Sequence, residues 1–121
     1  MNLSATLLAR ASDPGRTAVR ELSRSLSYAE LASRVVHFGG ALHELGVVAG
    51  DRVVILLPDT IEAVVSILGA IHIGAIAVPL AEWSTALDIR AHVQDAQAVV
   101  AVVGGKTGPL LDQVRQEVTS L

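Results

Sequence analysis

Apolar residues recur at intervals of three and four positions along residues 28–45, which is the spacing of one face of an α-helix. Ser27 and Glu30 stand three residues apart at the start of this stretch, the spacing of a capping box that satisfies backbone N–H groups at a helix start. Gly46 follows the last apolar position and suits the left-handed conformation that ends many helices. The pattern therefore predicts a helix over residues 28–45. Its apolar face consists of Leu31, Val35, Phe38, Leu42 and Leu45.

The next stretch, residues 53–57, is a run of five apolar residues without alternation. A strand of this kind is buried on both faces, as in parallel sheets, so we predict a strand over residues 52–57. Pro58 ends it, and Asp59 then stands where a side chain can cap a new helix. We expect that helix to begin with Asp59 as its cap and to end at Gly74.

Helix-like and strand-like stretches alternate along the rest of the chain as well. The other strands that we expect are residues 17–20, 25–27, 75–80 and 99–103. The other helices that we expect are residues 1–11, residues 85–96 with Thr85 and Asp88 at a cap-like start, and residues 109–120. This alternation predicts an α/β fold with a mostly parallel sheet flanked by helices. No linker interrupts it, so residues 1–121 are predicted to form a single α/β unit.

Composition changes this picture in one respect. Apolar residues make up 51% of the chain and charged residues only 17%, which is a high apolar share for a small domain with proportionally more surface. The chain is therefore expected to be a piece of something larger or to associate with a partner. A net charge of -3 with scattered basic residues argues against nucleic acid as that partner. The absence of cysteine excludes disulfides and thiol chemistry, and it fits a cytoplasmic protein.

One stretch, residues 63–81, contains no formal charge and approaches the length of a membrane-spanning helix. Gly74 and Pro79 interrupt it, and its second half has the character of a short strand. A buried helix followed by a buried strand explains these features better than a membrane span, so we expect no membrane association.

Few residues are candidates for ligand binding, metal binding or catalysis. The glycine-rich segment 104–108 follows a predicted strand, a context in which phosphates bind, but its spacing fits neither the Walker nor the dinucleotide pattern. An ordinary strand-to-helix loop is the preferred interpretation. The four histidines lack the paired spacing of a metal site, so no metal ligand and no catalytic residue is assigned. Glu82 and Asp88 flank a predicted helix start, where acidic residues are favoured for structural reasons.

Trp83 is the one residue that we single out as a candidate ligand contact. It is the only tryptophan, and it follows the predicted strand 75–80, in a loop of the kind that binds ligands at the carboxyl edge of parallel sheets. Packing of the indole against the next helix is the competing interpretation, because the ring covers a large apolar area wherever it lies.

The order of these segments resembles the N-terminal region of the adenylate-forming superfamily, which includes acyl- and aryl-CoA ligases, luciferases and peptide-synthetase adenylation domains. The resemblance covers nearly the whole chain, and Asp59-Thr60-Ile61 with Leu68-Gly69-Ala70-Ile71 is closest to aryl- or acyl-CoA ligases. Five blocks in family-like order and spacing carry it: residues 26–31, 42–46, 50–53 with 57–59, 67–70, and 74–80.

The resemblance implies an enzyme that uses ATP and Mg²⁺ to join a carboxylate to AMP and then passes the acyl group to a thiol such as that of coenzyme A. The family's ATP-binding loop, ribose-binding Asp and catalytic Lys do not occur in these 121 residues. We therefore expect a scaffold portion of such an enzyme, inactive by itself, without cofactors of its own and partnered by the remainder of the enzyme. The alternative is a free-standing, non-catalytic module that self-associates or docks on a partner.

Overall fold

The computed structural model describes residues 8, 13, 15–21, 23–115, 118 and 121. The expected helix over residues 1–11 lies outside these residues apart from residue 8. The elements along the chain are β1 (Thr17–Glu21), β2 (Arg24–Ser27), α2 (Tyr28–Glu44), β3 (Arg52–Leu56), α3 (Ile61–His72), β4 (Ile76–Pro79), α4 (Ala86–Ala96), β5 (Val100–Val103) and α5 (Gly108–Arg115).

Strands β3, β4 and β5 form a parallel sheet with β3 in the centre, in the order β4-β3-β5. Strands β1 and β2 form a separate antiparallel hairpin. The prediction of an α/β fold with a mostly parallel sheet is confirmed. Strand β3 is buried along its apolar residues, as its continuous run of valine, isoleucine and leucine predicted.

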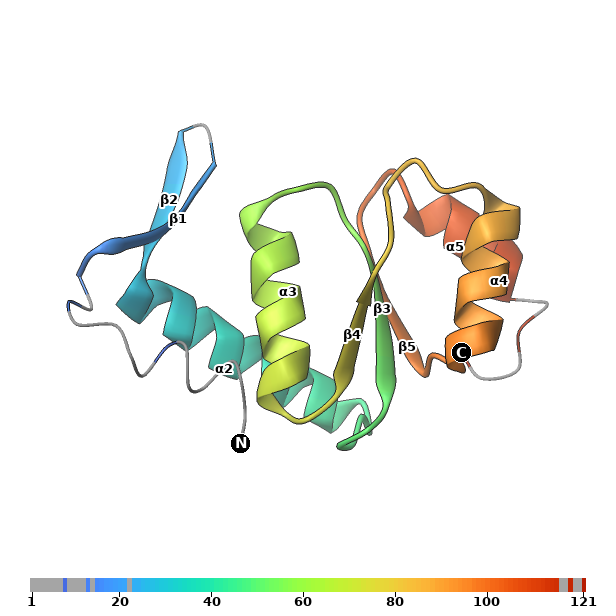
Figure 1. Cartoon of the computed structure of the whole chain (residues 1–121), viewed down its shortest axis with the longest axis horizontal. Helices are drawn as coiled ribbons and strands as arrows, with labels where there is room; N and C mark the ends of the chain where they lie inside the picture. The colour runs from blue at the N-terminus through green and yellow to red at the C-terminus, as the bar shows by residue number, and fades with distance from the viewer. Residues whose placement is uncertain (1–7, 9–12, 14, 22, 116–117, 119–120) are drawn as a thin grey trace.

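The helices cover the two faces of this sheet. Val53 and Ile55 of β3 pack with Leu42 of α2 and Ala70 of α3 in one cluster. Val54 and Leu56 point to the opposite face, where the residues packed with them are Ile89, Val93, Leu111 and Val114 of α4 and α5. Figure 1 shows α3 on one side of the sheet and α4 with α5 on the other. Side chains alternate along a strand, so one central strand supports both layers.

The predicted start and end of α2 are confirmed. Ser27 and Glu30 form the capping box, with both hydrogen bonds at 3.1 Å. The acceptors are the Ser27 hydroxyl and the Glu30 carboxylate, and the pKa of Glu30 is lowered by its bond from the Ser27 backbone N–H. Gly46 has a φ of +94°, as expected for a left-handed helix stop. Thr85 and Asp88 form a second capping box at α4.

One cap was wrongly assigned. The sequence pattern placed Asp59 at the N-cap of α3, whereas the structure places Thr60 there. The Thr60 hydroxyl accepts a hydrogen bond from the backbone N–H of Ala63 at 3.3 Å. Either residue type caps well, and the helix starts one position later because Pro58 and Asp59 still belong to the loop that leaves β3.

Several element ends also differ from the prediction. Strands β4 and β5 are shorter than residues 75–80 and 99–103. Helix α5 is defined to Arg115, and residue 118 is not helical, so the expected helix to residue 120 is too long. Strand ends depend on pairing with a neighbour, which local propensity does not report.

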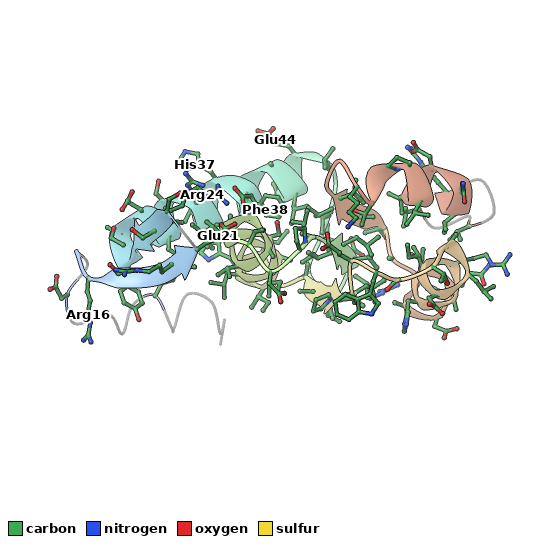
Figure 2. All side chains as sticks on the ribbon, turned by 90° about the horizontal axis from the view of Figure 1, so that it is seen from above. Arg16, Glu21, Arg24, His37, Phe38 and Glu44 are labelled. Carbon is green, nitrogen blue, oxygen red and sulfur yellow. The ribbon has the colours of Figure 1, made fainter. Side chains whose placement is uncertain are left out.

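The hairpin is attached to α3 by a small charge cluster. Arg24 of β2 donates to Glu62 of α3 at 2.7 and 2.9 Å and also pairs with Glu21 of β1. Glu21 in turn accepts a hydrogen bond from the backbone N–H of Ile61 at 3.2 Å. Figure 2 labels Arg24 and Glu21 at this contact and Phe38 on α2. The cluster ties the hairpin to the N-terminus of α3.

None of the helices in the described residues is long and apolar enough to cross a membrane. The uncharged stretch 63–81 instead comprises most of α3, a turn at Gly74 with a φ of +83°, and β4.

Candidate functional site

The carboxyl edge of the parallel sheet is the candidate functional site. The chain leaves β3 toward α3 on one face and leaves β5 toward α5 on the other face, so adjacent strands send their loops in opposite directions. Such a point in the strand order opens a crevice outside the strand ends, where α/β proteins commonly bind ligands. The crevice lies between the loops that follow β3 and β5.

A hollow of about 250 Å³ occupies this position. The loops after all three strands of the sheet contribute to it. Its lining consists of Leu57, Pro58, Thr60, Glu62, Glu82, Gly104, Gly105, Lys106 and Thr107. The walls are mainly apolar, with one cation and two carboxylates around them, which is the general make-up of a small-molecule site.

Thr107 joins the two loops that bound the hollow. Its side chain is 1% exposed, and its hydroxyl donates to the backbone carbonyl of Leu56, the last residue of β3, at 2.7 Å. The same oxygen accepts a hydrogen bond from the backbone N–H of Gly104 at 3.2 Å. A buried hydroxyl with both bonds made holds the glycine-rich loop against the end of β3. The segment 104–108 runs from the end of β5 into the first residue of α5, and these two hydrogen bonds fix its position.

The charged groups of the hollow differ in their surroundings. Glu62 accepts hydrogen bonds from Arg24, and this bond above all lowers the pKa of the Glu62 carboxyl to about 2. Glu62 therefore stays ionised at neutral pH and cannot serve there as a general acid. Lys106 and Glu82 come from the loops after β5 and β4. Together they supply a cation and a carboxylate that can orient a polar ligand.

Trp83 lies in the loop after β4, next to Glu82, and its side chain is 86% exposed. Within the described residues the indole is not buried against the following helix, so the packing interpretation is not supported. Its role as a ligand contact stays a prediction. Asp88 is engaged in the cap of α4, in agreement with its structural interpretation.

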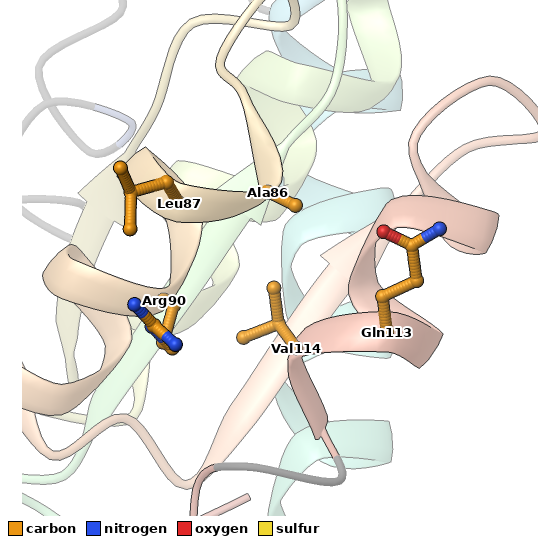
Figure 3. A pocket seen from close by; sticks show the side chains of 5 residues that line it. All are labelled: Ala86, Leu87, Arg90, Gln113 and Val114. Carbon is orange, nitrogen blue, oxygen red and sulfur yellow. The ribbon is translucent and has the colours of Figure 1, made fainter.

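A second hollow, of about 180 Å³, lies between α4 and α5 (Figure 3). Figure 3 shows Ala86, Leu87 and Arg90 of α4 on one side of this hollow and Gln113 and Val114 of α5 on the other. Its residues include no pair of nucleophile and base, and the loops of the sheet do not reach it. It is the weaker candidate for chemistry.

Sequence reasoning missed two residues of the site. Thr60 and Thr107 determine the geometry of the loops after β3 and β5, yet neither was singled out. Thr60 could have been found as a second cap candidate beside Asp59. Thr107 gave no such signal, because its partner Leu56 is 51 positions away in the sequence. In the part of the chain that the structure describes, no three His, Asp or Glu residues lie together as a potential metal site.

The sequence of this chain matches a known protein family. A sequence model described as AMP-binding enzyme matches residues 8–121. Acetyl-coenzyme A synthetase of Pasteurella multocida is 37% identical over 94 residues, which cover 73% of this chain and 14% of that enzyme. The chain thus spans about one seventh of the length of this curated relative.

Two solved structures resemble the chain in backbone as well as sequence. One is the anthranilate CoA ligase AuaEII in complex with anthranoyl-AMP, with a TM-score of 0.92 and 27% identity over 98% of this chain and 23% of that one. The other is a benzoate CoA ligase from Burkholderia xenovorans LB400, with a TM-score of 0.90 and 26% identity over 96% of this chain and 24% of that one. Both are CoA ligases for aromatic acids by their descriptions, in agreement with the resemblance noted from sequence.

Proposed function

Since this chain belongs to the AMP-binding enzyme family, we propose that it forms a scaffold portion of an ATP-dependent enzyme that activates a carboxylate as its acyl-adenylate, most nearly an acyl-CoA ligase. The observation that carries the proposal is the backbone similarity, over 98% of this chain, to a CoA ligase that was solved with an acyl-adenylate. Identity of 37% to an acetyl-coenzyme A synthetase supports the same class of reaction.

In such an enzyme a carboxylate displaces pyrophosphate from ATP to form an acyl-adenylate, and a thiol then displaces AMP. ATP, Mg²⁺ and coenzyme A would serve the complete enzyme. The described residues of this chain contain no group of three or more His, Asp or Glu that could hold a metal ion, and in the glycine-rich loop the Gly104 N–H already bonds to the Thr107 hydroxyl. We assign these residues the task of holding the carboxyl-edge loops in place.

Within this proposal Trp83 contacts a ligand of the complete enzyme. Its exposure, its position after β4 and the neighbouring hollow all support that role. The physiological partner of the chain is the remainder of the adenylating enzyme. We place the enzyme in the cytoplasm, which is supported by the absence of cysteine from the sequence.

The proposal is tested on the complete polypeptide that contains these 121 residues. Carboxylate-dependent release of pyrophosphate from ATP and Mg²⁺ should be measured with acetate, benzoate, anthranilate and a long-chain fatty acid. Acyl-CoA formation should follow when coenzyme A is added. No release of pyrophosphate with any of a broad panel of carboxylic acids would contradict the assignment.

A second measurement tests the scaffold role itself. Calorimetric titration of the isolated 121-residue chain with ATP and Mg²⁺ should give no heat of binding. Micromolar binding would mean that the carboxyl-edge hollow itself binds the nucleotide, and the scaffold assignment would then be wrong.

A further inference from the structure

Glu62 takes part in two features of the structure. It lines the carboxyl-edge hollow together with Lys106 and Glu82. Its carboxylate also accepts two hydrogen bonds from the guanidinium of Arg24, from Nη1 to Oε1 at 2.7 Å and from Nη2 to Oε2 at 2.9 Å. Arg24 itself belongs to strand β2 of the hairpin and is not part of the lining of the hollow. A residue of the hairpin thus engages one of the two carboxylates of the hollow.

Lys106 is the cation on the other side of this relationship. It is exposed in the loop after β5, and in the described part of the chain no ion pair joins it to Glu62 or Glu82. The ammonium of a lysine sits on a flexible four-carbon stem, so it can swing toward a carboxylate in the same hollow. Arg24 opposes such a contact with Glu62, because both carboxylate oxygens are already bonded to its guanidinium.

The charge of Glu62 makes this competition matter. Hydrogen bonds from Arg24 lower the pKa of the Glu62 carboxyl from an ordinary value of 4.5 to about 2. Glu62 is therefore an anion at neutral pH when Arg24 holds it, and it would still be an anion at its ordinary pKa if Arg24 released it. A released Glu62 carboxylate can pair with Lys106, and a paired ammonium attracts other anions less strongly.

We propose that Arg24 is a positioning residue of the carboxyl-edge hollow, which holds the Glu62 carboxylate on the hairpin and thereby keeps the Lys106 ammonium free for an anionic group of an enzyme ligand. This inference rests on the proposed function, because the ligands of such an enzyme, a carboxylic acid, ATP and coenzyme A, all carry negative charge. Arg24 does not contact the ligand. It acts through Glu62, and Lys106 supplies the contact.

Steady-state kinetics of the complete polypeptide test the proposal. Arg24→Gln should raise the KM of the ligand that occupies the hollow by about three- to five-fold, the upper range for one exposed ion pair. The kcat should stay within about two-fold, because the lost contact contributes to binding. Separate KM measurements for the acid, ATP and coenzyme A identify the ligand. An unchanged KM for all three, or a fall in kcat alone, would overturn the proposal.

A second substitution separates this role from mere attachment of the hairpin. Adding Glu62→Gln to Arg24→Gln should restore the KM, because a neutral amide cannot pair with Lys106 as an anion does. The contact between hairpin and α3 is missing in this double variant as well, so a KM that stays raised would reveal a structural role only and contradict the proposal. Arg24→Lys keeps a cation on the hairpin and should raise the KM less than Arg24→Gln.

Arg20→Gln is the matched control. It removes the same charge from the same hairpin, but Arg20 is exposed on β1 and does not line the carboxyl-edge hollow. The three KM values should therefore stay unchanged. An increase as large as that of Arg24→Gln would mean that the overall charge of the hairpin sets the KM, and the proposal would be wrong. The effect of Arg24→Gln should also shrink at high ionic strength, because exposed charges are screened.

Chemical labelling of Lys106 gives a readout that does not depend on enzyme activity. Lys106 is the only lysine of the 121 residues, and cleavage after arginine places it in the fragment 91–115. Its acetylation by a succinimidyl ester should be about two- to five-fold slower in Arg24→Gln than in the wild-type polypeptide, since pairing with a carboxylate favours the protonated, unreactive amine. Adding Glu62→Gln should restore the rate. Equal rates, or a Lys106 that resists labelling in the wild type, would overturn the proposal.

The two readouts also distinguish failure of this proposal from failure of the proposed function. Slower labelling in Arg24→Gln that Glu62→Gln reverses, in a polypeptide without carboxylate-dependent release of pyrophosphate, would contradict the proposed function and leave the effect of Arg24 on Lys106 standing. An active ligase in which neither KM nor labelling responds to Arg24→Gln would refute the positioning role alone.

Discussion

The guanidinium of Arg52, the first residue of β3, donates a hydrogen bond from its Nε to the backbone carbonyl of Ala96, the last residue of α4, at 2.6 Å. The same side chain donates to the carbonyls of Gln97 and Gly50, both at 3.1 Å. Carbonyls at a helix end have no partner within the helix, and a cation beside them also complements the helix dipole. Arg52 therefore anchors the C-terminus of α4 to the central strand.

Replacement of Arg52 by Met should lower the free energy of unfolding by about 1.5–3 kcal/mol, because the apolar stem is kept and the charged hydrogen bonds are lost. The unfolding free energy of Arg52→Lys should lie between those of the wild-type chain and Arg52→Met. The lysine keeps the charge, but one ammonium cannot reproduce the planar fork of donors. Urea unfolding measures both. Arg34→Met, at an exposed position of α2, is the control and should change stability by less than about 0.5 kcal/mol. Equal effects at both positions would rule out the anchoring role.

Thr107→Val should destabilise the chain by about 1–3 kcal/mol although it keeps the shape of the side chain, because the Leu56 carbonyl loses its buried donor. Thr107→Ser keeps the hydroxyl and should cost less. Thermal unfolding of both variants gives the comparison. A more stable valine variant would show that the hydroxyl does not hold the glycine-rich loop.

Gly69 lies where α3 crosses α2. A Cβ atom there would stand 2.6 Å from Cδ1 of Phe38, whereas a Cβ on Gly40 would meet nothing within 4 Å. Gly69→Ala should therefore destabilise the fold by about 1–3 kcal/mol through overpacking. Gly40→Ala should stabilise it by about 0.5–1 kcal/mol through helix propensity. Changes of the same sign in urea unfolding would mean that the helices do not pack this closely.

The ion pair of Glu62 with Arg24 predicts how the stability of the fold depends on pH. Its pKa falls from an ordinary value of 4.5 to about 2 in the folded chain, mainly through hydrogen bonds from Arg24. A depressed carboxyl pKa stabilises the fold above pH 4.5, and this contribution is lost as the pH falls toward 2. The pair is half exposed, so screening keeps the contribution below about 1 kcal/mol.

The difference in unfolding free energy between the wild-type chain and Glu62→Gln should be present at pH 7 and shrink between pH 4.5 and 2. The other carboxyl groups cancel in this difference. With Arg24→Gln already in place, Glu62→Gln should have little further effect. A difference that stays constant with pH would contradict the assigned ion pair.

Trp83→Ala should leave the stability of the chain unchanged, because the indole is 86% exposed. In the complete enzyme it should lower kcat/KM for the acid, ATP or coenzyme A by about five-fold or more, the effect of losing one aromatic contact. Leu87→Ala, at another exposed apolar side chain nearby in sequence, is the control and should leave the kinetics unaltered. Unchanged kinetics in both variants would remove Trp83 from the ligand site.

The sequence by itself determined the local features of this protein. The capping box of Ser27 and Glu30, the buried character of β3 and the glycine stops depend on residues a few positions apart, and all of them lie where the pattern predicted. The alternation of helices and strands was sufficient to predict the fold class, and the order of the motifs was sufficient to predict the family.

Tertiary structure decided the placement of β3 in the centre of the sheet, and with it every contact that depends on strand order. Arg52 is hydrogen-bonded to Ala96, 44 positions away in the sequence, and Thr107 to Leu56, 51 positions away. No local sequence pattern predicts either pair. The hollow at the carboxyl edge exists because α3 and α5 lie on opposite faces of the sheet. Periodicity reports which side of an element is buried, but the identity of the neighbour is set by the packing of the whole chain.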